Sequence, residues 1–170
     1  MLTLINIFFP TWMLGAIPSY LWLIMLPVNF LIDSLVLLIW AKVKNVQKIG
    51  DFWKHSIVPV WCFGFVSDLL AAFVLCLLYF GGYALYEQFG LVFIDGLFSN
   101  VMIGWGSFFY GLFGALIGGL LIYFLNRRWS FRKTALSTLQ QKSAALWLAI
   151  LTAPWLLAIP TEFLYNNLLG

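Results

Sequence analysis

Long apolar runs separated by short polar connections make up most of the chain. Four runs, each near the ~20 residues with which a helix crosses the hydrocarbon, cover about residues 19–41, 57–80, 97–125 and 144–164. These runs are apolar on all sides, unlike the ~10-residue alternating segments of a membrane β-barrel. An open sheet would leave edge N–H and C=O groups without partners in lipid. The pattern therefore predicts an all-α integral membrane protein, a four-helix transmembrane bundle.

The first 18 residues are apolar but interrupted. Pro10 and Pro18 divide them into pieces that are too short to span a bilayer, because each proline interrupts helical hydrogen bonding. We expect an N-terminal interfacial or re-entrant segment over residues 1–18, and the alternative is a short fifth span that places the N-terminus inside. No soluble domain or low-complexity stretch separates the spans, so residues 1–170 are predicted to form a single membrane domain.

Composition supports the bilayer as the solvent of this chain. Hydrophobic residues make up 64% and charged residues only 9%, with a mean hydropathy of +0.99, whereas soluble domains carry about 25% charged residues. Aromatic residues reach 19%. Trp40, Trp53 and Trp61 lie near predicted span ends, as aromatic belts at the headgroup level do. The lipid bilayer is therefore the first expected partner.

The positive charges predict the orientation. All 9 Lys and Arg residues fall in the connections 42–56 and 126–143, which an even number of spans requires to share one side. The positive-inside rule makes that side cytoplasmic and both termini non-cytoplasmic. We therefore expect a multi-pass protein of the cell membrane. Since the cations flank apolar spans, the formal charge of +3 predicts no nucleic-acid partner.

Two aspartates lie inside predicted spans. Asp33 follows Asn29 by one helical turn, and Asp68 follows Gly64 by one turn. A charge near the bilayer centre costs at least ~2.5–3.5 kcal/mol, so each carboxylate should face protein or a water-filled cavity. The antiparallel spans place both acids at similar depth. We expect these four residues to form an ion- or partner-binding site, neutralised by a shared proton, a cation or a basic group of another chain; the alternative is simple hydrogen-bonded packing.

The third span carries closely spaced small residues. Such spacing lets helix backbones approach each other, as in GxxxG helix pairs. The candidates for helix packing or oligomer contact are Gly111, Gly114, Ala115, Gly118 and Gly119.

After the third span, cations alternate with aromatic side chains in IYFLNRRWSFRK. This pattern suits anionic lipid headgroups, at ~1 kcal/mol per cation near the surface, and the candidates are Arg127, Arg128, Arg132 and Lys133. The string FLNRRWSFR also resembles the cytoplasmic segment of GtrA-like membrane proteins, small multispan proteins associated with moving lipid-linked sugars. The match covers Asn126 to Arg132; one predicted span follows it here, where the family has two. The resemblance implies a role in lipid-linked sugar translocation.

Little in the sequence points to catalysis. His55 is the single histidine, and no cluster of nucleophiles, bases or metal ligands accompanies it, so we predict no enzyme activity, cofactor or metal. Pro154 should kink the last span, and Thr152 could then bond the freed carbonyl of Ile150.

We expect an assembly or accessory subunit of a larger membrane complex, with other membrane subunits or further copies of the chain as partners. The alternative is a small oligomeric transporter or channel, coupled to ions or protons or GtrA-like, with Asp33 and Asp68 lining the path.

Overall fold

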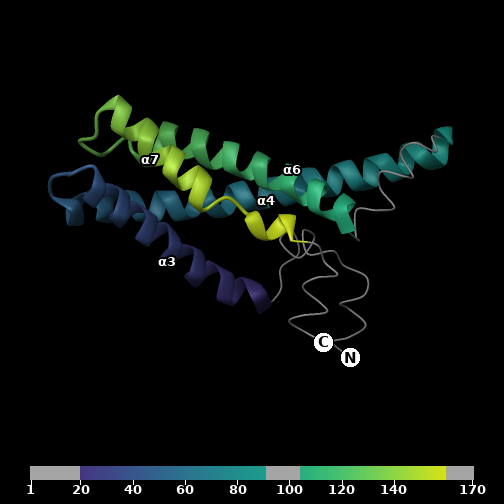
Figure 1. Ribbon diagram of the computed structural model, residues 1–170, viewed down its shortest axis with the longest axis horizontal. Coiled ribbons are helices and arrows are strands. Elements are labelled where there is room, and N and C mark those ends of the chain that lie inside the picture. Colours follow the sequence, from purple (N-terminus) through teal and green to yellow (C-terminus); the bar gives the residue numbers. More distant parts are fainter. Residues whose placement is uncertain (1–19, 91–103, 160–170) are drawn as a thin grey trace. The chain divides into compact units, whose positions relative to one another are not determined.

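A computed structural model describes residues 20–90 and 104–159, and these residues are helical with no strand among them. The elements are α3 (Tyr20–Val43), α4 (Ile49–Phe89), α6 (Gly104–Leu125), the π-helical turn η1 (Asn126–Ser130), α7 (Thr138–Leu151) and the 3₁₀ turn η2 (Trp155–Ala158) (Figure 1). The all-α prediction is confirmed. The predicted N-terminal segment 1–18 lies outside the described residues, as do 97–103 of the third predicted span and 160–164 of the fourth.

Three helices are long and apolar enough to cross a membrane: Leu23–Val43, Ile49–Phe89 and Phe108–Ser130. They coincide with the first three predicted spans and support a membrane location. Their outward side chains are apolar, with Leu35 58%, Phe73 54% and Leu120 60% exposed. Hydrophobic residues on the outside are expected where lipid replaces water as the surrounding solvent.

The fourth predicted span differs from the structure. The helix α7 begins at Thr138, six residues before the predicted start, and ends at Leu151. Its 14 residues extend about 21 Å at 1.5 Å per residue, short of the ~30 Å of hydrocarbon. Four spans are therefore not confirmed over the described residues. The early start follows from a capping box, in which Ser137 and Gln140 exchange side-chain-to-backbone hydrogen bonds and so satisfy free N–H groups of the first turn.

The end of α7 also corrects a predicted contact. Pro154 lies three residues after the last residue of α7 instead of kinking a continuous helix, and it directly precedes the 3₁₀ turn η2. The Thr152 hydroxyl lies 2.9 Å from the carbonyl oxygen of Leu148 and donates to it, where we expected Ile150 as the acceptor. The prediction was wrong about the acceptor because the hydroxyl of a helical threonine reaches back one turn, to the residue four positions earlier.

The helix α4 is longer than its predicted span at both ends. It has 41 residues, about 60 Å at 1.5 Å per residue, or twice the ~30 Å of hydrocarbon. Its first turns lie in the predicted connection 42–56, where Phe52 and Ser56 are buried and packing extends the helix. It ends at Phe89, and the next residue, Gly90, has a φ of +61°, the left-handed conformation common just after a helix.

The described helices divide into two compact units. The first comprises residues 20–68 and 117–153, and the second comprises residues 69–90, 104–116 and 154–159. The helices α4 and α6 contribute residues to both.

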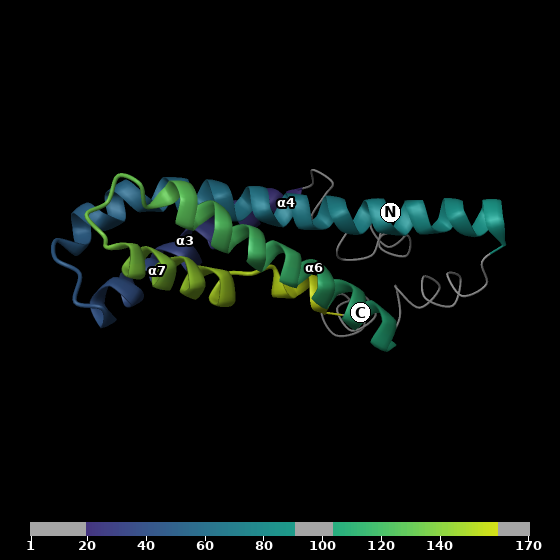
Figure 2. The same ribbon diagram turned by 90° about the horizontal axis from the view of Figure 1, so that it is seen from above.

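Aromatic and aliphatic side chains fill the first unit. Here α3 and α7 pack side by side in both views (Figures 1 and 2). Trp40 is fully buried and its indole N–H donates to the Ser143 hydroxyl at 3.2 Å. Its ring lies 5.7 Å from that of Phe52, which in turn stacks on Phe131 at 6.2 Å between centroids. The predicted role of Trp40 in an interfacial belt was wrong, because the ring is a core residue.

Small residues let the helices of the second unit approach closely. A Cβ added to Gly111 would lie 1.8 Å from the backbone oxygen of Leu157, and one added to Gly114 would lie 2.5 Å from the Leu75 side chain. The Tyr110 hydroxyl donates to the Leu75 carbonyl. In this unit α6 therefore approaches η2 and α4 at distances that only glycine permits.

Candidate functional site

Asp33 lies on the buried face of α3. Its side chain is 4% exposed, and Leu37, Trp40 and Ala41 continue the same face toward the aromatic core of the first unit. Their spacing of four, seven and eight residues follows the helical repeat. The helix therefore directs the carboxyl into protein, while its opposite face carries exposed Leu31 and Leu35.

Two other elements of the first unit enclose this carboxyl. The position of a Cβ on Gly64 of α4 lies 3.4 Å from the Asp33 Oδ2 atom, so the absence of a side chain at residue 64 leaves space around that oxygen. The Thr152 hydroxyl, just beyond the end of α7, lies close enough to the Asp33 carboxyl to interact with it. Three helices thus define the surroundings of one acid.

Thr152 cannot satisfy all of its neighbours at once. The same hydroxyl donates to the Leu148 carbonyl, and a threonine has one proton to donate. When Thr152 donates to Leu148, the Asp33 carboxyl must bring a proton of its own to bond the hydroxyl oxygen. An ionised Asp33 can accept the Thr152 proton only if that hydroxyl leaves the Leu148 carbonyl. The two possible bonds of Thr152 therefore differ in the protonation state of Asp33 that they fit.

Asp68 is the electrostatic neighbour of Asp33. It lies one turn after Gly64 on α4, and the two aspartates interact through their charges. Its Oδ1 atom is buried and has no hydrogen-bond partner among the described residues. Ser34, next to Asp33, also has a buried hydroxyl without such a partner. The first unit thus holds two neighbouring acids whose polar atoms are only partly satisfied.

Electrostatics limits the states that this pair can adopt. Like charges on neighbouring carboxylates disfavour double ionisation, and burial strengthens the effect. No Lys, Arg or His lies within the first three predicted spans. The pair must therefore hold a proton, bind a cation or meet a positive group from elsewhere. Among the described residues, no group of three or more His, Cys, Asp or Glu comes together.

The structure thus brings together three of the four residues predicted for this site. Asp33, Gly64 and Asp68 are neighbours, and Asn29 is half-buried one turn earlier on α3. Sequence reasoning missed Thr152 as a contact of Asp33. The signal available was a threonine two residues before a proline in an apolar run, which alone names no partner.

The small residues predicted for packing or oligomer contact are buried within the chain. In the second unit, Gly111 and Gly114 contact η2 and α4, and Ala115 is buried. In the first unit, a Cβ on Gly119 would lie 3.2 Å from the Ala149 backbone oxygen of α7, and Gly118 is buried. Contacts within the chain account for the close spacing of these residues.

The first five residues of the NRRWSFR motif form the π-helical turn η1, in which Asn126 and Ser130 are buried. The Asn126 amide donates to the Ile122 carbonyl at 2.9 Å, and the Ser130 hydroxyl donates to the Asn126 side-chain oxygen at 2.6 Å. The Arg127 guanidinium lies 6.0 Å from the centre of the Tyr123 ring. Arg128, Arg132 and Lys133 are exposed, so lipid contact by these cations stays a prediction.

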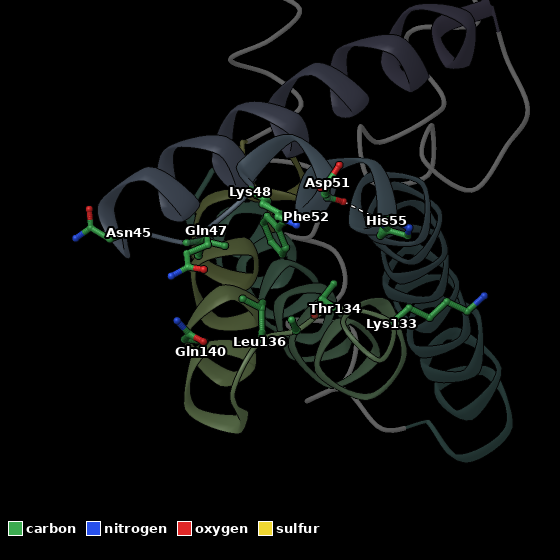
Figure 3. Close-up of a pocket in the computed structure, with 12 residues that line it drawn as sticks. Asn45, Gln47, Lys48, Asp51, Phe52, His55, Lys133, Thr134, Leu136 and Gln140 are labelled. Carbon is green, nitrogen blue, oxygen red and sulfur yellow. Dashed lines mark hydrogen bonds between the residues drawn. The ribbon is translucent and has the colours of Figure 1, made fainter.

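A cavity of about 600 Å³ lies between the two polar connections of the first unit. Lys48, Asp51 and His55 line it from one connection and the start of α4, and Lys133 and Gln140 line it from the other (Figure 3). The His55 Nδ1 atom lies 2.7 Å from the Asp51 backbone oxygen; because a carbonyl only accepts, Nδ1 carries the proton. Sequence reasoning missed the cavity, since it depends on two distant loops, with Lys48 and Lys133 85 positions apart, folding against each other.

Comparison with known proteins finds no family model, no curated protein and no solved structure that matches this chain.

Proposed function

We propose that this chain is a small membrane transport protein in which Asp33 and Asp68 exchange a proton or a monovalent cation during the transport cycle. The observation that carries the proposal is the pairing of two acids inside one helical unit, with the Asp68 Oδ1 atom left without a partner among the described residues. Intramembrane acids are costly to maintain, so their presence favours a functional role.

The hydrogen-bond pattern around Thr152 supports the same function. An ionised Asp33 can accept the Thr152 proton only if that hydroxyl leaves the Leu148 carbonyl. Thr152 is the residue that directly follows α7. Loading and unloading the acid pair would thereby change a hydrogen bond at the end of a helix.

The proposal includes four spans, with the fourth beginning in α7 and continuing beyond the described residues. It also includes cytoplasmic connections at 42–56 and 126–143, termini on the other side of the cell membrane, and assembly of several copies. These features rest on the hydrophobic pattern and on the placement of the Lys and Arg residues.

Flux measurements on the purified protein test this function. The full chain is reconstituted in liposomes that contain a pH-sensitive dye, and a potassium diffusion potential is applied, with and without a sodium gradient. We expect the native chain to move protons or sodium. Asp33→Asn and Asp68→Asn should reduce the flux at least tenfold, because the amide keeps the shape of the acid and cannot ionise.

The matched control is Asp51→Asn, which removes an exposed acid and should leave the flux unchanged. Size-exclusion profiles and helix content of all variants must equal those of the native chain. No flux in the native protein, or full flux in both variants of the pair, would overturn the proposal.

A second function is favoured by the same unpartnered oxygen. A lysine or arginine from another membrane protein could neutralise Asp68, which would make the chain an assembly or accessory subunit. Purification in mild detergent separates the two functions: a stoichiometric second polypeptide, lost in Asp68→Asn and kept in Asp51→Asn, supports the subunit. Recovery of this chain alone, with flux after reconstitution, supports transport.

A further inference from the structure

The cavity between the two polar connections carries an excess of positive charge. Two lysines, Lys48 and Lys133, line it together with a single acid, Asp51. The first turn of the 41-residue helix α4 also borders it, and the dipole of a helix places a partial positive charge at its first turn. An anion is therefore the ligand that this electrostatic environment favours.

The other polar side chains that line the cavity can form hydrogen bonds with hydroxyl groups of a ligand. Gln47 and Gln140 direct their amides toward one another at one flank of the cavity, while the Lys48 side chain lies beside Phe52 (Figure 3). The Nδ1 atom of His55 is used in a bond to the Asp51 carbonyl, so the Nε2 atom is the ring nitrogen left to contact a ligand. Asp51 is an acceptor. Amides and acceptors of this kind bind hydroxyl groups beside a charged centre.

Two residues of the cavity lining have an uncommon backbone conformation. Asn45 and Lys48 have φ values of +50° and +52°, and the left-handed region is rarely adopted by residues with a Cβ. Asparagine enters it most readily, whereas a lysine there carries a backbone cost. Both residues line the cavity. The short turn before α4 thus keeps a cationic side chain at the cavity despite a backbone cost.

We propose that this cavity binds a phosphate ester that carries hydroxyl groups, with Lys48 bonding the phosphate and Gln47, Gln140 and Asp51 contacting the hydroxyls. The cavity lies at the ends of apolar helices, where lipid headgroups are found, and a glycerol-phosphate headgroup has this chemistry. A soluble glycerol phosphate has the same chemistry. The site is separate from the acid pair and does not depend on the transport function.

Ligand-dependent thermal stability of the full chain in detergent tests the proposal, since a ligand that binds only the folded state raises the unfolding temperature. The probes are phosphatidylglycerol, sn-glycerol 3-phosphate and, as a zwitterionic lipid, phosphatidylcholine. We expect saturable stabilisation by phosphatidylglycerol if the source is a lipid, or by glycerol 3-phosphate if it is a soluble ester. Phosphatidylcholine should give a weaker effect than either.

The decisive variant is Lys48→Asn, which removes the charge and retains a residue that tolerates positive φ. We expect binding at least ~10-fold weaker, because a charge-assisted hydrogen bond contributes ~1.5–3 kcal/mol. The matched control is Lys44→Gln, an exposed lysine of the same turn outside the cavity lining, and it should keep native affinity. Gln47→Leu is a second variant with a smaller expected loss, about 3-fold, should Lys48→Asn fold poorly.

Two results would overturn the proposal. The first is the absence of saturable stabilisation by both phosphate probes. The second is equal weakening by Lys48→Asn and Lys44→Gln, which would reveal general attraction of anions to a basic surface in place of a defined site.

Discussion

The two units of this protein hold their helices together in different ways. All six buried polar or charged side chains of the described residues lie in the first unit: Asp33, Ser34, Ser56, Ser67, Asn126 and Ser130. The buried side chains of the second unit are apolar and mostly small, with Ala71, Ala72 and Ala115 among them. Small residues permit close packing in lipid without polar groups.

This difference separates the unit that holds the candidate functional groups from the unit that is held together by close apolar packing. Polar groups in a lipid environment need partners, and the first unit leaves four of its own without one among the described residues, namely in Ser34, Trp53, Ser56 and Asp68. The second unit avoids that cost through close contact between α6 and its neighbours. Unsatisfied polar groups are therefore concentrated where we place the function.

The largest expected effect comes from the aromatic core of the first unit. Trp40→Ala removes a fully buried ring and should destabilise the protein by about 3 kcal/mol, the lower end for buried tryptophans, because lipid also solvates the unfolded helices. Unfolding in increasing sodium dodecyl sulfate measures the loss.

The control for this prediction is Trp129→Ala. Trp129 is 46% exposed and its loss should cost below ~1 kcal/mol. Equal losses for the two tryptophans would contradict the assignment of Trp40 to the core.

A smaller effect is expected in the second unit. Gly111→Ala forces a methyl group into the Leu157 backbone oxygen and should cost about 2 kcal/mol through overpacking. Hydrogen exchange should show faster exchange at η2 and the start of α6 than in native protein.

Gly81→Ala is the matched control for this glycine, since no atom lies within 4 Å of the added Cβ. It should be neutral or slightly stabilising, because alanine favours helix more than glycine. A Gly111→Ala protein with native stability and native hydrogen exchange would contradict the view that the second unit, unlike the first, depends on close contacts at glycine.

The smallest expected effect has the opposite sign. Asp68→Leu replaces a partly unsatisfied acid by an apolar side chain, and such replacements are often neutral or stabilising. We expect a gain of about 1 kcal/mol in the same detergent titration, together with loss of flux. A loss of stability above ~2 kcal/mol would instead assign Asp68 to packing.

Much of the architecture follows from the hydrophobic pattern. The runs around Asp33, Asp68 and Ala115 became helices that can span a membrane, because apolar runs in lipid must satisfy their own backbone. The proximity of Asp33 to Gly64 and Asp68 followed from helical periodicity and an antiparallel pair of spans. Helical periodicity is enough to predict a contact where it determines which face of the helix a side chain occupies.

Other features depend on contacts between distant residues. The capping box at Ser137 and the burial of Phe52 extended helices beyond their apolar runs. The contact of Thr152 with Asp33 joins residues more than 100 positions apart. The cavity at Lys48 needs both a left-handed turn and a second loop. The hydropathy pattern does not show which distant residues will contact each other.

The π-helical turn at Asn126–Ser130 also affects which length changes the chain can accept. A π turn holds one residue more than an α turn, so deleting one residue here would restore ordinary helical pitch. In an ordinary α-helix each residue removed rotates the following chain by about 100°, whereas here the return to α pitch takes up the missing residue. Phe131 would then keep its place against the ring of Phe52, which it meets at 6.2 Å. A single-codon deletion in this turn would therefore be tolerated better than one in the middle of α6.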